Sequence, residues 1–171
     1  MLKFIFVLAC FAIAVISYFF CHSKRDWFWL TCGLFFTVLA DYFLVLQNSH
    51  LPGVAVFCFV HVCYILRVQR DNIWLGLLII VPVIVGFLFY NGWLYALAGF
   101  YAMLFITNIT VNIKWRKQNK ALVVTGLILF ALCDINVAVY NFAPQFSLVF
   151  ALIWVFYLPS QFLLAISGIK A

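Results

Sequence analysis

The chain contains no glutamate, and its 171 residues include only four acidic side chains, all of them aspartates. Charged residues make up 8% of the sequence, whereas they form about a quarter of an ordinary soluble domain. Hydrophobic residues make up 69%, and the mean hydropathy is +1.21. This composition excludes a soluble globular domain and predicts an integral membrane protein.

Several motifs of catalytic and binding sites are also missing. The sequence has no Gly-x-Ser-x-Gly element, no glycine-rich phosphate loop and no internal repeat. The six cysteines form no Cys-x-x-Cys pair, so we expect them to pack as small hydrophobic side chains. The three histidines fall at different predicted depths, which excludes a three-histidine zinc site. We therefore expect no metal and no cofactor; a metal site of Asp41, His61 and Asp134 is the alternative.

Apolar runs between short polar segments predict the membrane spans. A helix needs about 20 residues to cross a bilayer. The first run is expected to be a retained helix, because no small-x-small cleavage site precedes the basic turn that follows it. The sequence predicts an all-α polytopic membrane bundle, a single integral membrane domain over 1–171, with seven transmembrane helices near 2–20, 27–46, 53–69, 73–89, 93–113, 121–142 and 147–167.

The lysines and arginines predict the orientation of this bundle. With seven spans, nine of the ten basic residues fall on one side of the membrane, and Lys3 is the exception. Short cytoplasmic loops collect Lys and Arg, so we expect the N-terminus outside and the C-terminus in the cytoplasm, in a bacterial inner membrane. The net charge of +6 then reflects contact with anionic membrane lipids, and no nucleic-acid partner is predicted.

The four aspartates form two groups. Asp26 and Asp71 lie in predicted loops beside basic residues, where we expect solvated turn roles. Asp41 and Asp134 lie inside predicted spans, where an ionisable side chain costs about 2.5–3.5 kcal/mol and usually faces a bundle interior or a wet cavity. This second pair is therefore the main functional candidate.

Helix geometry brings other polar side chains to the depth of the two aspartates. A rise of 1.5 Å per residue places Asp41 about 8 Å and Asp134 about 12 Å below the outer surface, with His61 and Tyr157 at about 12 and 15 Å. Further polar residues follow at helical spacing on the same or neighbouring spans, and together they predict a polar cavity among five helices. These residues are Tyr64, Tyr101, Asn108, Asn112 and Gln161. The alternative role of these amides and phenols is interhelical hydrogen bonding.

Four short stretches resemble the motifs of one family. They occupy 39–44 around Asp41, 59–64 around His61, 126–134 up to Asp134, and 157–161 from Tyr157. In this order they resemble the YhhN-like family of membrane lysoplasmalogenases. Ala40 stands where that family commonly has Gly, and Cys133 stands where it has Ser.

The resemblance implies hydrolysis of the vinyl ether bond of a lysoplasmalogen, with a lysophospholipid as substrate partner. Asp41 and Asp134 would supply acid and base, and His61 and Tyr157 would complete the catalytic set. The residues expected to bind the polar part of the lipid are Tyr64, Asn108, Asn112 and Gln161. The alternative is a small lipid or proton-coupled membrane transporter or binding protein, because paired intramembrane aspartates also relay protons.

Overall fold

The computed structural model describes residues 2–21, 23–68, 93–116, 118–142 and 147–170. Within these ranges the chain is helical apart from short turns and an isolated bridge between Cys21 and Ile169. The all-α prediction is therefore confirmed. The predicted span at 73–89 and Asp71 lie outside the described residues.

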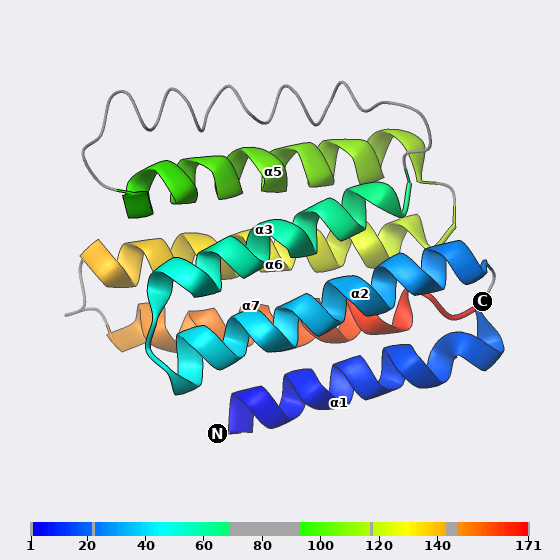
Figure 1. The fold of residues 1–171 in the computed structure, drawn as a ribbon, viewed down its shortest axis with the longest axis horizontal. Helices are drawn as coiled ribbons and strands as arrows, with labels where there is room; N and C mark the ends of the chain where they lie inside the picture. Colours follow the sequence, from blue (N-terminus) through cyan, green and yellow to red (C-terminus); the bar gives the residue numbers. More distant parts are fainter. Residues whose placement is uncertain (1, 22, 69–92, 117, 143–146, 171) are drawn as a thin grey trace.

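The helices follow the apolar runs of the sequence (Figure 1). Helix α1 (Leu2–Ile16) continues as a 3-10 turn (Ser17–Phe20), and α2 (Lys24–Asp41) continues as a π-helical turn (Tyr42–Leu46). They are followed by α3 (His50–Leu66), α5 (Trp93–Trp115), α6 (Lys120–Phe142) and α7 (Ser147–Ile166).

Four of the described helical segments are long and apolar enough to cross a membrane: Lys24–Leu46, Leu97–Lys114, Lys120–Asn141 and Leu148–Ile166. The apolar helices Phe4–Phe20 and His50–Leu66 are shorter. The described part of the chain thus fits a polytopic membrane protein.

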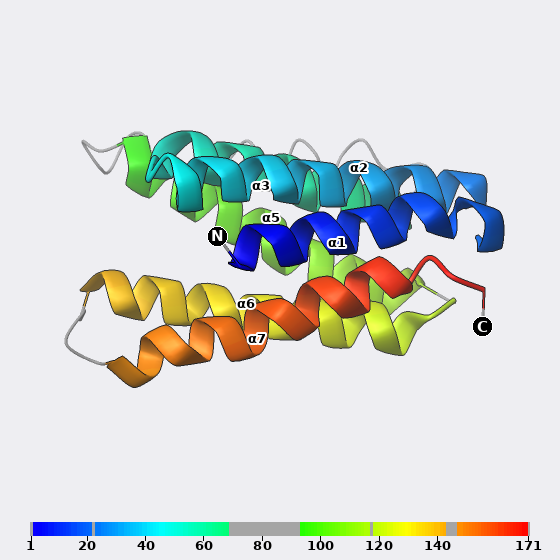
Figure 2. The same cartoon turned by 90° about the horizontal axis from the view of Figure 1, so that it is seen from below.

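The helices form two layers, which are seen edge-on in Figure 2. Helices α1, α2 and α3 lie in one layer, and α6 and α7 lie side by side in the other. Helix α5 packs against α3 and α6, and α1 packs against α7. The two layers are therefore connected on both sides of the bundle. The core between them contains Leu30, Leu34, Val60, Leu127 and Leu164.

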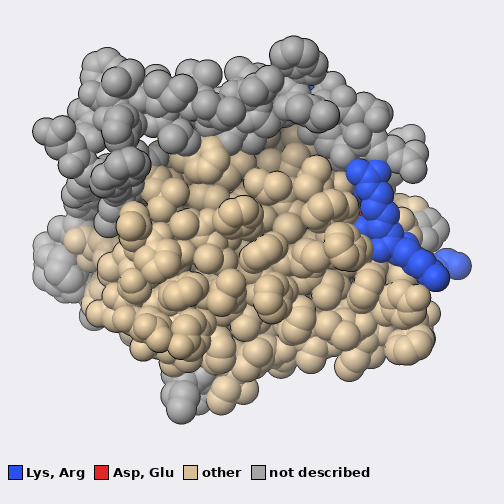
Figure 3. Space-filling view, viewed as in Figure 1, with Lys and Arg blue, Asp and Glu red and all other residues tan. Residues whose placement is uncertain are grey.

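The basic side chains that the structure describes lie at one end of the bundle. Helices α2 and α6 begin there, and α3, α5 and α7 end there (Figure 1). The face in Figure 3 shows Lys and Arg only at this end. We call it the basic end, and its residues are Lys24, Arg25, Arg67, Lys114, Arg116, Lys120 and Lys170.

Asp26 is not a solvated turn residue, and that prediction was wrong. Its carboxylate accepts hydrogen bonds from the guanidinium groups of Arg67, at 3.1 and 2.8 Å, and of Arg116, at 2.9 and 3.2 Å. The side chains of Arg67 and Arg116 are only 1% and 6% exposed, and that of Asp26 is 21% exposed. Arg67 also donates to the hydroxyl of Ser167 at 3.2–3.3 Å. This ion network connects α2 to the ends of α3, α5 and α7.

Candidate functional site

Asp41 is the last residue of α2 before the π-helical turn, and its side chain points into the bundle. The residue is 5% exposed. The phenol of Tyr157, from α7, donates a hydrogen bond to Asp41 Oδ2 at 2.5 Å. The two residues are 116 positions apart in the sequence. Because α2 and α7 belong to different layers, this hydrogen bond connects the two layers.

Asp134 has a tyrosine partner of its own. The phenol of Tyr101, from α5, donates a hydrogen bond to Asp134 Oδ2, on α6. Asp134 is half-buried, whereas Asp41 is buried. Ring contacts connect the two tyrosines, because Tyr101 packs against Phe57, Phe57 against Phe130, and Phe130 against Tyr157. The site therefore consists of two aspartate–tyrosine pairs contributed by four helices.

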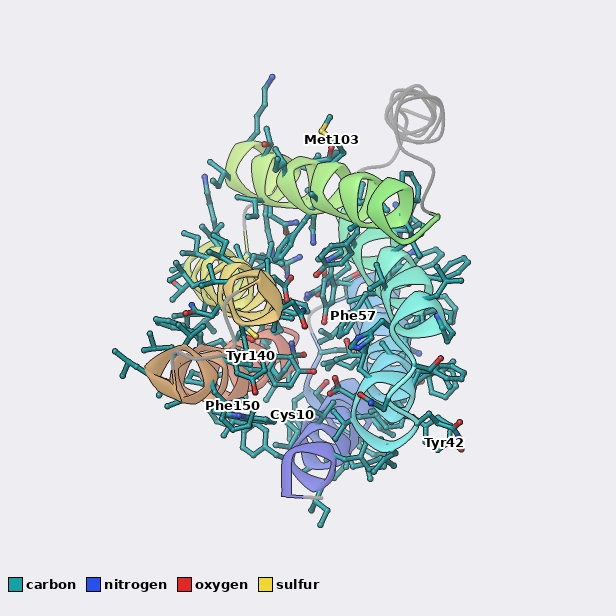
Figure 4. The ribbon with its side chains drawn as sticks, turned by 90° about the vertical axis from the view of Figure 1, so that its left-hand side faces the viewer. Cys10, Tyr42, Phe57, Met103, Tyr140 and Phe150 are labelled. Atoms are coloured by element: carbon teal, nitrogen blue, oxygen red, sulfur yellow. The ribbon has the colours of Figure 1, made fainter. Side chains whose placement is uncertain are left out.

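A group of aromatic rings lies next to these pairs. Phe130 contacts the ring of Tyr157 at a centroid distance of 5.9 Å, and Phe57 contacts Phe130 at 5.6 Å and Tyr101 at 6.2 Å. Figure 4 shows Phe57 pointing into the interior of the bundle, whereas Tyr42 and Met103 point away from it. We refer to Phe57, Phe105 and Phe130, with the rings of Tyr101 and Tyr157, as the aromatic cluster.

His61 lies within the aromatic cluster and is fully buried. Its ring centroid is 4.2 Å from that of Phe105 and 4.9 Å from that of Tyr101. The amide of Asn108 contacts His61 Nδ1 at 3.1 Å, and the amide of Asn112 contacts Asn108 Oδ1 at 2.8 Å. The NH₂ groups of both amides thus contact protein atoms, while Asn112 Oδ1 has no hydrogen-bond partner among the described residues; the predicted role of Asn108 and Asn112 in lipid binding stays a prediction.

Tyr64 and Gln161 lie one turn further toward the basic end than His61 and Tyr157. Both are fully buried. Tyr64 packs against Gly33, where an added Cβ would be 2.7 Å from Tyr64 Cε1, and the Arg67 guanidinium lies 5.9 Å from the Tyr64 ring centroid. Among the described residues, Gln161 Oε1 has no hydrogen-bond partner. Tyr64 therefore lies between the aspartate pair and the ion network of Asp26.

Tyr101 lies on a predicted polar stripe but is not among the predicted catalytic or substrate-binding residues. Its spacing from Asn108 and Asn112 indicates the inward face of α5. Helical phase identifies a face and not the neighbour that this face meets, so the contact with Asp134, 33 residues away, was not predictable from spacing. Among the described residues, no group of three His, Cys, Asp or Glu side chains is placed to hold a metal ion.

The π-helical turn begins directly after Asp41. The main-chain N–H of Gln47 donates to the main-chain carbonyl of Tyr42 at 3.1 Å, a hydrogen bond that spans five residues instead of the four of an α-helix. Such turns occur mostly as single insertions in α-helices, often at functional sites, because the extra residue redirects the side chains beside it. No pattern in the sequence predicted this turn.

In the described part of the chain, fold and site together define an all-helical membrane protein with two aspartates in its interior, each hydrogen-bonded to a tyrosine. The chain belongs to the YhhN family, whose sequence model matches residues 1–168. The resemblance predicted from the four motifs is thereby confirmed, and it extends over nearly the whole chain. Comparison with curated proteins and with solved structures finds no match. Membership of the family is consistent with a hydrolase.

Proposed function

We propose that the protein hydrolyses the vinyl ether bond of lysoplasmalogens and releases a fatty aldehyde and a glycerophospho-headgroup. The observation that carries this proposal is the pair of interior aspartates, each bonded to a tyrosine and flanked by aromatic rings, in a chain of the YhhN family. The proposed setting is a bundle of seven spans in a bacterial inner membrane. Its N-terminus would lie outside and its basic end in the cytoplasm, as the clustering of Lys and Arg favours.

Vinyl ether hydrolysis needs one proton donor and one proton acceptor. A carboxylic acid protonates the alkene carbon that does not carry oxygen, and the other carbon becomes an oxocarbenium ion. Water adds to this cation and loses a proton to the ionised carboxylate. The resulting hemiacetal collapses to the aldehyde, and the glycerol oxygen leaves as a hydroxyl. Asp41 and Asp134 would divide these two roles, as paired carboxylates do in glycoside hydrolysis.

The neighbouring side chains support this division of labour. Tyr157 and Tyr101 each donate a phenol hydrogen bond to one carboxyl group. The environments of the two acids differ in burial, because Asp41 is buried and Asp134 is half-buried. Acids in unlike environments can take unlike roles. The aromatic cluster would border the developing cation, whose charge the faces of aromatic rings attract. Gln161 would accept a hydrogen bond from the polar part of the lipid.

The test is product analysis by mass spectrometry, with purified protein in detergent and a lysoplasmalogen in deuterated water. We expect fatty aldehyde carrying one deuterium on the carbon next to the carbonyl, because the first step delivers a solvent-derived proton there. Asp41→Asn and Asp134→Asn should each abolish aldehyde release. Cys133→Ser is the matched control, since it changes the residue beside Asp134 to the one common in the family and should retain activity.

An acyl lysophospholipid serves as the second substrate. Release of fatty acid from it, with no aldehyde from the lysoplasmalogen, would overturn the proposed reaction in favour of ester hydrolysis. If folded wild-type protein consumes neither lipid, the hydrolase proposal fails. A proteoliposome assay of lipid or proton movement then tests the transporter alternative, which needs no turnover in detergent.

A further inference from the structure

Three fully buried polar side chains form a hydrogen-bonded chain that ends at His61. Asn112 Nδ2 lies 2.9 Å from the main-chain oxygen of Asn108 and 2.8 Å from Asn108 Oδ1. Asn108 Nδ2 lies 3.1 Å from His61 Nδ1. All three residues are 0% exposed.

The direction of every bond in this chain follows from the main-chain carbonyl at its start. A carbonyl oxygen can only accept, so the NH₂ group of Asn112 must face it. The same NH₂ group donates to Asn108 Oδ1, which turns the NH₂ group of Asn108 toward His61. An amide N–H can only donate, so His61 Nδ1 must offer a lone pair. The proton of the imidazole is therefore on Nε2.

We infer that Asn112 and Asn108 hold His61 as the neutral Nε2–H tautomer, so that His61 acts on the bound lipid as a hydrogen-bond donor and not as a base. The lipid partner in this inference rests on the proposed function. A base would need a lone pair directed at the substrate, and the Asn108 amide occupies the lone pair of this ring. Asn108 and Asn112 are thus positioning residues.

The surroundings of Nε2 indicate what its N–H group binds. Among the described residues, His61 Nε2 has no hydrogen-bond partner. The rings around it belong to Tyr101, Phe105 and Phe130, and the Tyr101 hydroxyl already donates to Asp134. A buried N–H without an acceptor is costly, so the group is suited to an oxygen of a bound ligand. In a lysoplasmalogen, that oxygen is the vinyl ether oxygen or a glycerol oxygen.

The tautomer can be measured without any substrate. The double variant His22→Gln, His50→Gln leaves His61 as the only histidine, and ¹⁵N-histidine labelling then reports its two nitrogens by NMR. We expect an unprotonated, pyridine-type Nδ1 and a protonated, pyrrole-type Nε2. In Asn108→Leu, which removes the amide, the two signals should move toward each other as both tautomers become populated. An Nδ1–H tautomer or an imidazolium in the parent protein would overturn the inference, whether or not Asn108→Leu folds.

Activity separates a donor from a base at the same position. His61→Gln keeps an N–H group near the position of Nε2 but cannot take up a proton, whereas His61→Leu provides neither. A donor role predicts aldehyde release by His61→Gln close to that of wild type and a loss of about 2- to 13-fold in His61→Leu, which is the fold-change equivalent to one hydrogen bond of about 0.5–1.5 kcal/mol. Equal inactivity of the two folded variants would contradict the donor role. If wild type releases no aldehyde, the proposed reaction fails while the NMR result still decides the tautomer.

Discussion

Replacement of Asp26 by Asn should destabilise the protein strongly, although this residue lies far from the aspartate pair. The Asp26 carboxylate accepts four guanidinium hydrogen bonds of 2.8–3.2 Å from Arg67 and Arg116. In Asp26→Asn the negative charge is lost, and the new NH₂ group faces a donor. Both arginines are nearly buried, so two positive charges remain together without a counter-charge.

The size of this effect follows from the burial of the network. Removing one partner of a buried ion pair costs about 3–5 kcal/mol. Because Asp26 is 21% exposed, we expect the lower limit, about 3 kcal/mol. On the scale of about 2–4 °C per kcal/mol for chains of this size, the unfolding temperature should fall by about 6–12 °C. Tryptophan fluorescence of the detergent-solubilised protein during heating would measure this fall.

Two controls show whether the network causes the change. Lys120→Gln removes an exposed charge at the same end and should leave the unfolding temperature within about 2 °C, since exposed charges contribute little. The triple variant Asp26→Leu, Arg67→Met, Arg116→Met should recover much of the loss, because it leaves no unpaired buried charge. A fall of less than about 2 °C in Asp26→Asn would refute the reasoning.

Three further predictions concern the packing and the site. Gly33→Ala should lower the free energy of unfolding by about 1–3 kcal/mol, because its Cβ would be 2.7 Å from Tyr64 Cε1, both inside the core. Gly99→Ala, whose added Cβ has no atom of a neighbouring described element within 4 Å, should instead stabilise α5 by up to about 1 kcal/mol; chemical denaturation compares the two, and equal effects would contradict the packing argument. Tyr101→Phe and Tyr157→Phe should each lower kcat about tenfold or more, since a hydrogen bond to a charged group contributes about 1.5–3 kcal/mol. Unchanged turnover in both folded variants would show that the phenols do not serve the carboxylates.

The helices were largely predictable because a membrane span is a long apolar run, but their ends were not. The predicted span starts near 53, whereas α3 begins at His50 and has Pro52 in its first turn. A proline ring is tolerated in the first turn of a helix, where its missing N–H would have no partner in any case. The π-helical turn at Tyr42–Leu46 was missed for a related reason, since a change in hydrogen-bond register leaves the apolar composition unaltered.

Partners across helices account for the other differences between prediction and structure. The four motifs and the depth estimate selected Asp41 and Asp134, and their tyrosine partners come from helices that no local pattern connects to them. Asp26 has Lys24 and Arg25 as sequence neighbours, but it binds arginines that are 41 and 90 residues away. Spacing predicts which face of a helix is polar, and only the packing of helices decides which polar groups meet.

The position of the ion network has a consequence for how a lipid could reach the interior. The network binds the layer of α2 and α3 to the ends of α5 and α7 at the basic end, about 22 Å along α2 from Asp41. Toward the other end, the layers are joined across the interior by the hydrogen bond from Tyr157 to Asp41. Under the proposed function, sideways entry of an acyl chain between the layers is therefore easier past this single hydrogen bond than past the ion network, which would keep the helix ends aligned.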